Sequence, residues 1–192
     1  MITPWGELRV ADAHIHFFSH KFLTLLGAQR QSTVAEIEPL LGWEMPAEDP
    51  TSLAGRWVNE LDRHGVARAA LIASLPGDES SVAAAIAAHP SRFFGYFLVN
   101  PLAPGALAAV DAALAAGLRG LCFFPAMHRY SMHDERAVAI LEMAAAHGRA
   151  LAFVHCGVLS VGVRAKLGLP SPFDMRFSNP LDLHALQKVV EV

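Results

Sequence analysis

Five short apolar runs, each followed or preceded by a segment with helical periodicity, constrain this chain more than any other feature of its sequence. They begin about 25–32 residues apart from the second run onward, which is close to the length of one strand-plus-crossover unit. Alternating strands and helices are typical of an α/β fold with a parallel sheet. The expected strands span about 8–17, 66–74, 93–100, 118–124 and 150–157.

The segments between these runs carry signals for helix ends. Thr51 or Ser52, then Ser80, and then Asp134 are candidate N-caps, and glycines follow the expected helices. Many of the intervening residues are alanines, which let a helix approach a sheet closely. Helices are therefore expected over about 51–64, 80–89, 105–117 and 134–148, with another beginning at Pro180.

The first crossover contains extra residues, about 18–50, between the first strand and its helix. In a barrel, such an insertion lies at the C-terminal mouth of the strands, where active sites are built. Two interpretations stay open. The insertion, which includes Trp43 and Met45, is either a lid over a site or a packing excursion without substrate contact.

The array predicts a single domain over residues 1–192, a partial (β/α)8 TIM-barrel-type fold. It contains strands one to five and the helix that follows them, and no sixth apolar run comes after it. Five strands do not close an eight-stranded barrel. We expect either a piece of a longer barrel or a sheet that stays open, and open strand edges would favour a homo-oligomer.

Charge and composition narrow the choice of partner. The formal net charge is −3, from 15 basic and 18 acidic residues, and no polybasic run is present. This balance argues against nucleic acid and membrane surfaces as partners and favours a small-molecule substrate. The first residues do not resemble a signal peptide, so we expect a cytoplasmic protein. Cys122 and Cys156 lie in apolar runs and are predicted to be reduced core thiols.

Histidines mark the ends of the first and last strands. Because side chains alternate along a strand, Asp12, His14 and His16 share one face, and His155 ends the fifth run on the face of Phe153. Three imidazoles at the C-terminal ends of barrel strands match the donor set of a catalytic zinc site. One His-x-His pair alone is more often solvent-facing or hydrogen-bonded, but the agreement of strand position and face favours metal binding.

Three further polar residues follow expected strands and are candidate substrate-binding groups. Asn100 follows the third strand, whereas His128 and Arg129 follow the fourth. The guanidinium of Arg129 could pair with a substrate carboxylate through its planar fork. Ordinary loop residues facing water are an equally good interpretation of all three.

Several motifs, in this order, resemble the amidohydrolase superfamily, and in particular its amidohydrolase-2 branch. The opening strand reads D-x-H-x-H, the third expected strand is aromatic, and the fifth ends in a histidine. The resemblance covers nearly the whole chain. The matching segments are VADAHIHF at 10–17, HPSRF at 89–93, GLRGL at 117–121 followed by Pro125, and GRALAFVHCG at 148–157.

The resemblance implies a metal-dependent hydrolase of (β/α)8 fold in which His14, His16 and His155 bind the metal. The branch includes mononuclear zinc hydrolases and non-oxidative decarboxylases. The carboxylated lysine of binuclear relatives is absent here, where residues 122–125 read CFFP, so one divalent ion, zinc, is expected. The family's Asp on strand eight and catalytic His on strand six have no counterpart.

Three functions therefore remain open at this point. The first is hydrolysis, in which metal-activated water attacks a carbonyl-type carbon of a small molecule. The second is metal-dependent decarboxylation on the same fold. The third is a non-catalytic half-barrel that binds a metal or a partner chain. No residue of this sequence is assigned as the catalytic acid or base.

Overall fold

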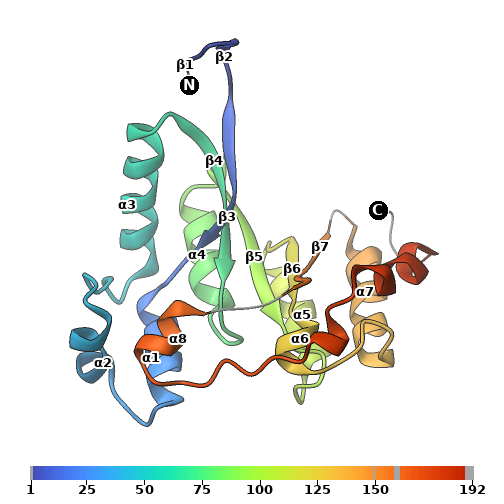
Figure 1. Ribbon diagram of the computed structural model, residues 1–192. Coiled ribbons are helices and arrows are strands. Elements are labelled where there is room, and N and C mark those ends of the chain that lie inside the picture. Colours follow the sequence, from blue (N-terminus) through green and yellow to red (C-terminus); the bar gives the residue numbers. More distant parts are fainter. Residues whose placement is uncertain (1, 149, 158–160, 189–192) are drawn as a thin grey trace.

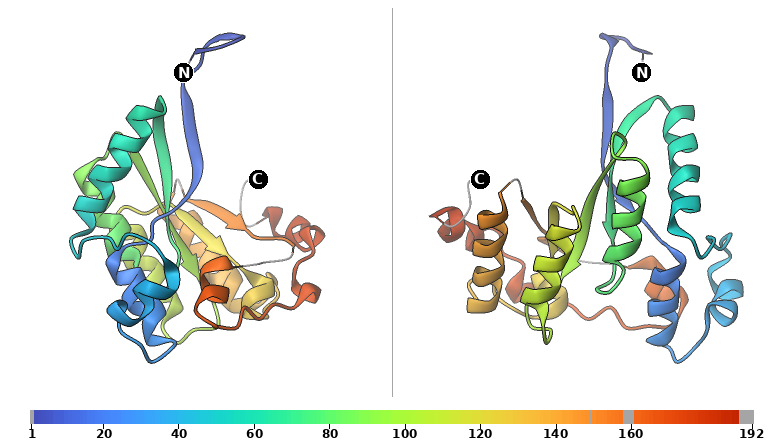
Figure 2. Two further views of the ribbon diagram at one scale, coloured as in Figure 1. Left: turned by 60° about the vertical axis from the view of Figure 1, so that its left-hand side comes forward. Right: turned by 180° about the vertical axis from the view of Figure 1, so that it is seen from behind.

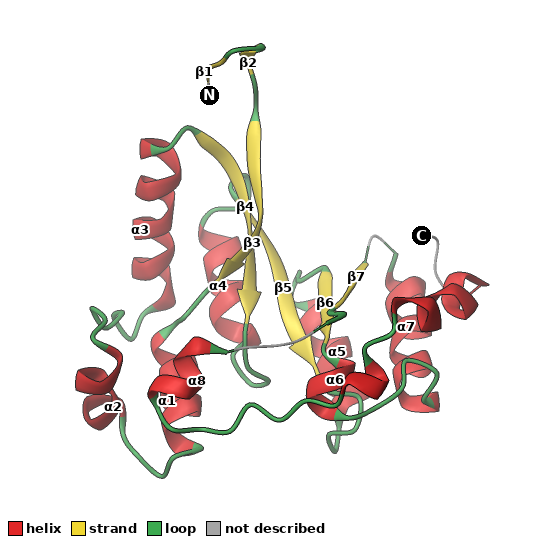
Figure 3. Cartoon of the chain, viewed as in Figure 1, coloured by secondary structure: helices red, strands yellow, loops and turns green. Residues whose placement is uncertain are grey.

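A five-stranded parallel sheet forms the centre of the protein (Figures 1 and 3). The computed structural model describes residues 2–148, 150–157 and 161–188. Its strands follow one another in sequence order, and each overlaps one of the five expected runs. The curled half-barrel confirms the predicted partial (β/α)8 fold. The strands are β3 (Val10–His16), β4 (Val66–Ala73), β5 (Phe93–Val99), β6 (Gly120–Phe123) and β7 (Leu151–Val154).

Four helices connect the strands and cover one face of the sheet, which is the near face when the molecule is seen from behind (Figure 2, right). They coincide with the four helices expected between the runs. Each one begins and ends within a few residues of the predicted bounds. These helices are α3 (Pro50–Arg63), α4 (Glu79–Ala88), α5 (Ala106–Ala115) and α7 (Glu135–His147).

The helix caps were predicted less well than the helices. Asp134 caps α7 as expected, and its carboxylate accepts a hydrogen bond from the Arg136 amide. The prediction of Thr51 or Ser52 for α3 is wrong, because Asp49 is the N-cap and Pro50 occupies the first turn, where a missing N–H costs nothing. Asp78, not Ser80, precedes α4, although its side chain caps no amide of that helix.

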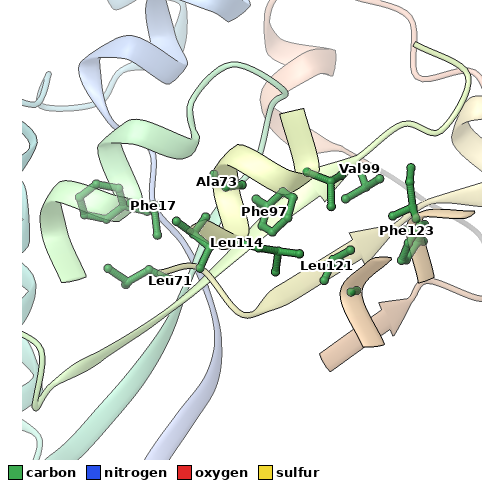
Figure 4. Close-up of a cluster of buried hydrophobic side chains, with 14 of the residues drawn as sticks. Phe17, Leu71, Ala73, Phe97, Val99, Leu114, Leu121 and Phe123 are labelled. Atoms are coloured by element: carbon green, nitrogen blue, oxygen red, sulfur yellow. The ribbon is translucent and has the colours of Figure 1, made fainter. Parts of the chain in front are cut away.

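The main core lies between the sheet and these helices (Figure 4). Alternate residues of the strands point toward it, so β4, β5 and β6 each contribute two or more buried apolar side chains to one continuous cluster, and β3 adds Ile15. Leu114 of α5 packs among them. The labelled strand residues of this cluster are Leu71, Ala73, Phe97, Val99, Leu121 and Phe123.

The other face of the sheet carries a smaller cluster of apolar side chains. Ile72, Leu98 and Cys122 project from three adjacent strands, and Phe124 follows β6. Short elements lie along this face: α6 (Pro125–His128), α8 (Gly162–Lys166) and the 3-10 helix η1 (Met175–Phe177) (Figure 1). A sheet with apolar side chains on both faces is expected for parallel strands.

The insertion between β3 and α3 folds into two helices, α1 (His20–Ala28) and α2 (Val34–Leu41). Together with α8 they enclose a second cluster of apolar side chains, separate from the main core, in which Val163 and Leu167 pack against the insertion. The Lys166 ammonium donates a hydrogen bond to the Leu41 carbonyl at 2.9 Å, and Arg30 donates to the Leu167 carbonyl. The insertion and α8 are thus packed as one unit.

Three features differ from the sequence-based expectations. The helix from Pro180 is a 3-10 helix, η2 (Pro180–Lys188), and a small hairpin, β1 (Ile2–Thr3) with β2 (Gly6–Glu7), precedes the sheet. Both cysteines are free, but Cys156 is exposed, so its assignment to the core is wrong. It lies just past β7, the last strand of the sheet. Within the described ranges, no helix is long and apolar enough to cross a membrane.

Gly120 of β6 allows β5 and β6 to pair closely. It is in register with Tyr96, and a Cβ at Gly120 would lie 1.9 Å from Cδ1 of the Tyr96 ring. The Gly120→Ala variant should therefore lower the free energy of unfolding by about 2 kcal/mol, because the ring must move. Gly55→Ala on α3 is the control, since its Cβ would meet nothing within 4 Å. Equal urea midpoints for the two variants would contradict this packing.

Asp78 is fully buried and links the loops that follow β3 and β4. Its carboxylate accepts a hydrogen bond of 2.7 Å from the Ser19 hydroxyl, and the Ser19 oxygen caps α1 by accepting from the Phe22 amide. Burial raises the pKa of Asp78 from 3.8 to about 6, an effect that these hydrogen bonds only partly oppose. The ionised carboxylate is thus less stable in the folded protein than in the unfolded chain.

The sign of this shift predicts how Asp78→Asn changes stability with pH. A raised carboxyl pKa stabilises the fold below pH about 4, and this contribution is lost as the pH rises through about 6. Relative to the wild type, the variant should gain up to about 3 kcal/mol in the free energy of unfolding between pH 4 and pH 7. Urea titrations at several pH values would measure it, and parallel pH profiles would contradict it.

Candidate metal centre

A cleft of about 580 Å³ opens at the C-terminal ends of the strands, on the inner face of the sheet, which is the face not covered by α3, α4, α5 and α7. This volume is in the range typical of small-molecule sites. Ile72, Leu98 and Phe124 of the inner-face cluster line it, and Phe18 and Trp43 contribute aromatic side chains from the insertion. Its polar lining includes His14, His16, Ser74, His128, His155 and Arg164.

His14 and His16 lie side by side in this cleft, as the alternation along β3 predicted. Their Nε2 atoms are 3.3 Å apart, and the rings meet edge to face with their centroids 5.0 Å apart. Two nitrogens bound to one tetrahedral zinc ion at about 2.0–2.1 Å would be about 3.3–3.4 Å apart. The pair therefore has the spacing that two ligands of one ion require.

A neighbouring strand orients the His16 ring. Nδ1 of His16 lies 2.7 Å from the hydroxyl oxygen of Ser74, the residue just past β4. That hydroxyl donates in turn to the Ile72 carbonyl at 3.2 Å. Because the Ser74 hydroxyl donates its one proton to the Ile72 carbonyl, it can only accept from His16. Nδ1 of His16 therefore carries a proton and donates it to Ser74. The Nε2 lone pair of His16 then faces His14, which is the tautomer that a metal ligand needs.

The charge state of His16 also suits a ligand. Removal from solvent, and to a smaller extent the nearby imidazole of His14, lower the pKa of His16 below its usual value. Asp12, the third residue of this face, uses its carboxylate to accept a hydrogen bond from the His14 amide at 2.9 Å. The regular pairing of β3 with β4 is interrupted between Asp12 and Ile15, so this bond satisfies backbone that lacks a strand partner.

His155 follows β7 on the same inner face and lines the same cleft. Its ring stacks on Phe124, with the centroids 5.3 Å apart, and its Nε2 is buried without a hydrogen-bond partner. An orphaned buried nitrogen is consistent with a missing ligand or ion. Among the described residues, however, no three His, Cys, Asp or Glu side chains form a metal-binding group. The structure brings His14 and His16 together and leaves His155 apart from them.

Of the candidate substrate-binding residues, the structure places one in the cleft. His128 lines it, and burial lowers the pKa of this imidazole to about 4, so it is neutral at pH 7. Asn100 lies outside the cleft lining, where its side chain accepts a hydrogen bond from the Leu102 amide. Arg129 is exposed, has a left-handed backbone at the end of α6, and also lies outside the lining.

Ser74 and Gln29 line the cleft, although the sequence did not single them out. Ser74 follows β4 in the same way that His16 ends β3, so its position after an apolar run was the available signal. Gln29 is a surface-type residue at the end of α1, and nothing in the sequence marks it. Arg164 was not singled out by the sequence either, and it enters the cleft because α8 packs on the insertion.

The fold is half of a β/α barrel, with a histidine pair at the C-terminal end of the first strand of its five-stranded sheet. Comparison with protein-family models places the chain among proteins of this barrel class. The amidohydrolase model, of the type designated Amidohydro_2, matches residues 11–189. The chain belongs to the amidohydrolase family.

A solved structure from Acinetobacter baumannii shows a similar fold. It is a probable 2-pyrone-4,6-dicarboxylic acid hydrolase with citric acid bound, and it aligns with a TM-score of 0.51 at 15% sequence identity. The alignment covers 78% of this chain and 50% of the other, so the chain spans about half the length of that relative. A comparison with curated protein sequences gave no match.

The hydrogen bond to Ser74 predicts the tautomer of His16. In the wild type at pH 8, the His16 ring should carry its proton on Nδ1, because Ser74 accepts it. In Ser74→Ala this preference should weaken toward a mixture of the two tautomers. Nitrogen-15 shifts of the imidazole rings, measured with chelator present, would report it. An unchanged His16 spectrum in the variant would contradict the assigned bond.

Proposed function

We propose that this chain carries the first part of the active site of a metal-dependent hydrolase acting on a small molecule. His14 and His16 would hold one divalent ion, with zinc as the expected metal, and His155 of the same cleft would be a third ligand if its side chain moves toward this pair. The observation that carries the proposal is the 3.3 Å separation of the two Nε2 atoms in a cleft at the mouth of a β/α half-barrel. Membership of the amidohydrolase family supports the same chemistry.

When bound, such an ion supplies Lewis acidity, which polarises a carbonyl-type group and strengthens water as a nucleophile near neutral pH. The chain's own residues prepare the site for it. Ser74 fixes the His16 tautomer, and the apolar floor formed by Ile72, Leu98 and Phe124 excludes water. His128 is neutral at pH 7 and can exchange hydrogen bonds with a polar substrate group without adding charge.

Two alternatives make different predictions. Decarboxylation at the same centre would release carbon dioxide and incorporate no oxygen from water into the product. A non-catalytic half-barrel would bind a metal or a second chain, as in a homo-oligomer, and would turn over no substrate. We prefer hydrolysis because the solved neighbour of similar fold is a probable hydrolase, whereas family membership fits both reactions.

The metal content of the purified protein tests the central part of the proposal. Wild-type protein, loaded with zinc and desalted, should hold about one ion per chain by elemental analysis. The His14→Ala, His16→Ala double variant should lose most of it. The matched control is His64→Ala, His133→Ala, which removes two exposed histidines outside the cleft and should keep full metal content. Equal metal content in the three proteins would contradict the assigned ligands.

Turnover distinguishes the reaction types. A panel of small esters, lactones and amides would be incubated with zinc-loaded protein in water enriched in oxygen-18. Hydrolysis predicts label in the product carboxylate, sensitivity to a chelator, and loss of turnover in the double variant. Carbon dioxide release without oxygen-18 in the product would show decarboxylation and not hydrolysis. Turnover that survives in the double variant would contradict the proposed centre.

A further inference from the structure

Arg164 is the one formally charged side chain among the described residues that line the cleft, apart from the imidazoles. It lies on α8, and the rest of the lining is largely apolar and includes Phe18 and Trp43. The Phe18 and Trp43 rings stack with their centroids 5.3 Å apart. A cation in an apolar cleft of this kind is a natural anchor for an anionic group of a ligand.

Two neutral acceptors hold the guanidinium in place. Its Nε donates to the Pro170 carbonyl at 2.9 Å, and its Nη1 donates to the Gln29 side-chain oxygen at 2.7 Å. Neither acceptor carries charge, and no carboxylate among the described residues forms an ion pair with Arg164. Some arginines differ in this respect: Arg92 and Arg176, for example, pair with aspartates. The positive charge of Arg164 is therefore held in position but not neutralised.

Partial burial of Arg164 also favours the binding of an anion. Loss of solvent lowers the pKa of Arg164, which means that its charged form has lost hydration without gaining an anion in return. A bound carboxylate would restore that interaction, and the planar guanidinium suits it because further N–H donors remain beyond the two bonds described.

We propose that Arg164 is a specificity-determining residue of this cleft, which selects ligands with a carboxylate, and that Gln29 of the insertion is its positioning residue. This rests on the proposed function only in using the same cleft, and it requires no metal. The insertion thereby contributes to selectivity as well as to the wall of the site. It holds a cation that belongs to α8, a segment about 135 residues further along the chain.

Binding of two small aromatic probes, one charged and one neutral, tests the proposal without knowledge of the substrate. Benzoate and benzamide have nearly the same shape and differ in charge. Titrations by calorimetry in the presence of chelator should show that wild-type protein prefers benzoate. Arg164→Gln should weaken benzoate binding about 10-fold or more, the loss of one charge-assisted interaction, and leave benzamide binding within about 2-fold.

Two further variants distinguish anion binding by Arg164 from the packing of the insertion against α8. Gln29→Glu keeps an acceptor but adds a negative charge beside Arg164, so it should weaken benzoate binding and spare benzamide. Arg30→Gln is the matched control, because Arg30 also joins the insertion to α8, through the Leu167 carbonyl, yet lies outside the cleft lining. It should leave the preference for benzoate intact. Thermal unfolding of each variant would verify that all are folded.

The results of these titrations do not depend on whether the protein binds zinc. Equal loss of benzoate and benzamide in Arg164→Gln would overturn the inference, since it would mean that the residue supports the fold of α8 only. Absence of a preference for benzoate in the wild type would also overturn it. Because the titrations contain chelator, a protein that fails to bind zinc can still confirm the role of Arg164.

Discussion

Burial of one face of the parallel sheet determines the arrangement of everything else in this protein. Because α3, α4, α5 and α7 cover the outer face, the strand residues that alternate with the outer core must point into the half-barrel. The side chains of Ile72 and Leu98 line the cleft for this reason, and His14 and His16 meet there. The chemistry of the site is thus a consequence of strand periodicity.

The second constraint is the contact between the insertion and α8. These segments are far apart in the sequence, yet they share an apolar cluster and two hydrogen bonds to backbone carbonyls. They add aromatic side chains and Arg164 to a cleft whose floor and histidines come from the sheet. The histidine pair proposed to bind a metal and the wall proposed to select ligands therefore come from different parts of the fold, so selectivity can vary while the histidine pair stays fixed.

The sequence predicted the elements that depend on local periodicity. The five strands, the four connecting helices and the shared face of His14 and His16 all follow from the spacing of apolar residues. Features that depend on contacts between distant segments were not predictable in this way. The roles of Ser74 and Gln29 became clear from their hydrogen bonds to His16 and Arg164, and Asn100 lies outside the cleft lining, where it accepts a hydrogen bond from the Leu102 amide.

The position of a bound ion tests the account most directly. Crystals grown with zinc, with diffraction recorded on both sides of the zinc absorption edge, would locate it from anomalous differences. The account predicts one strong peak at about 2.0–2.2 Å from the Nε2 atoms of both His14 and His16. A peak elsewhere in the molecule, with these two imidazoles unligated, would contradict it.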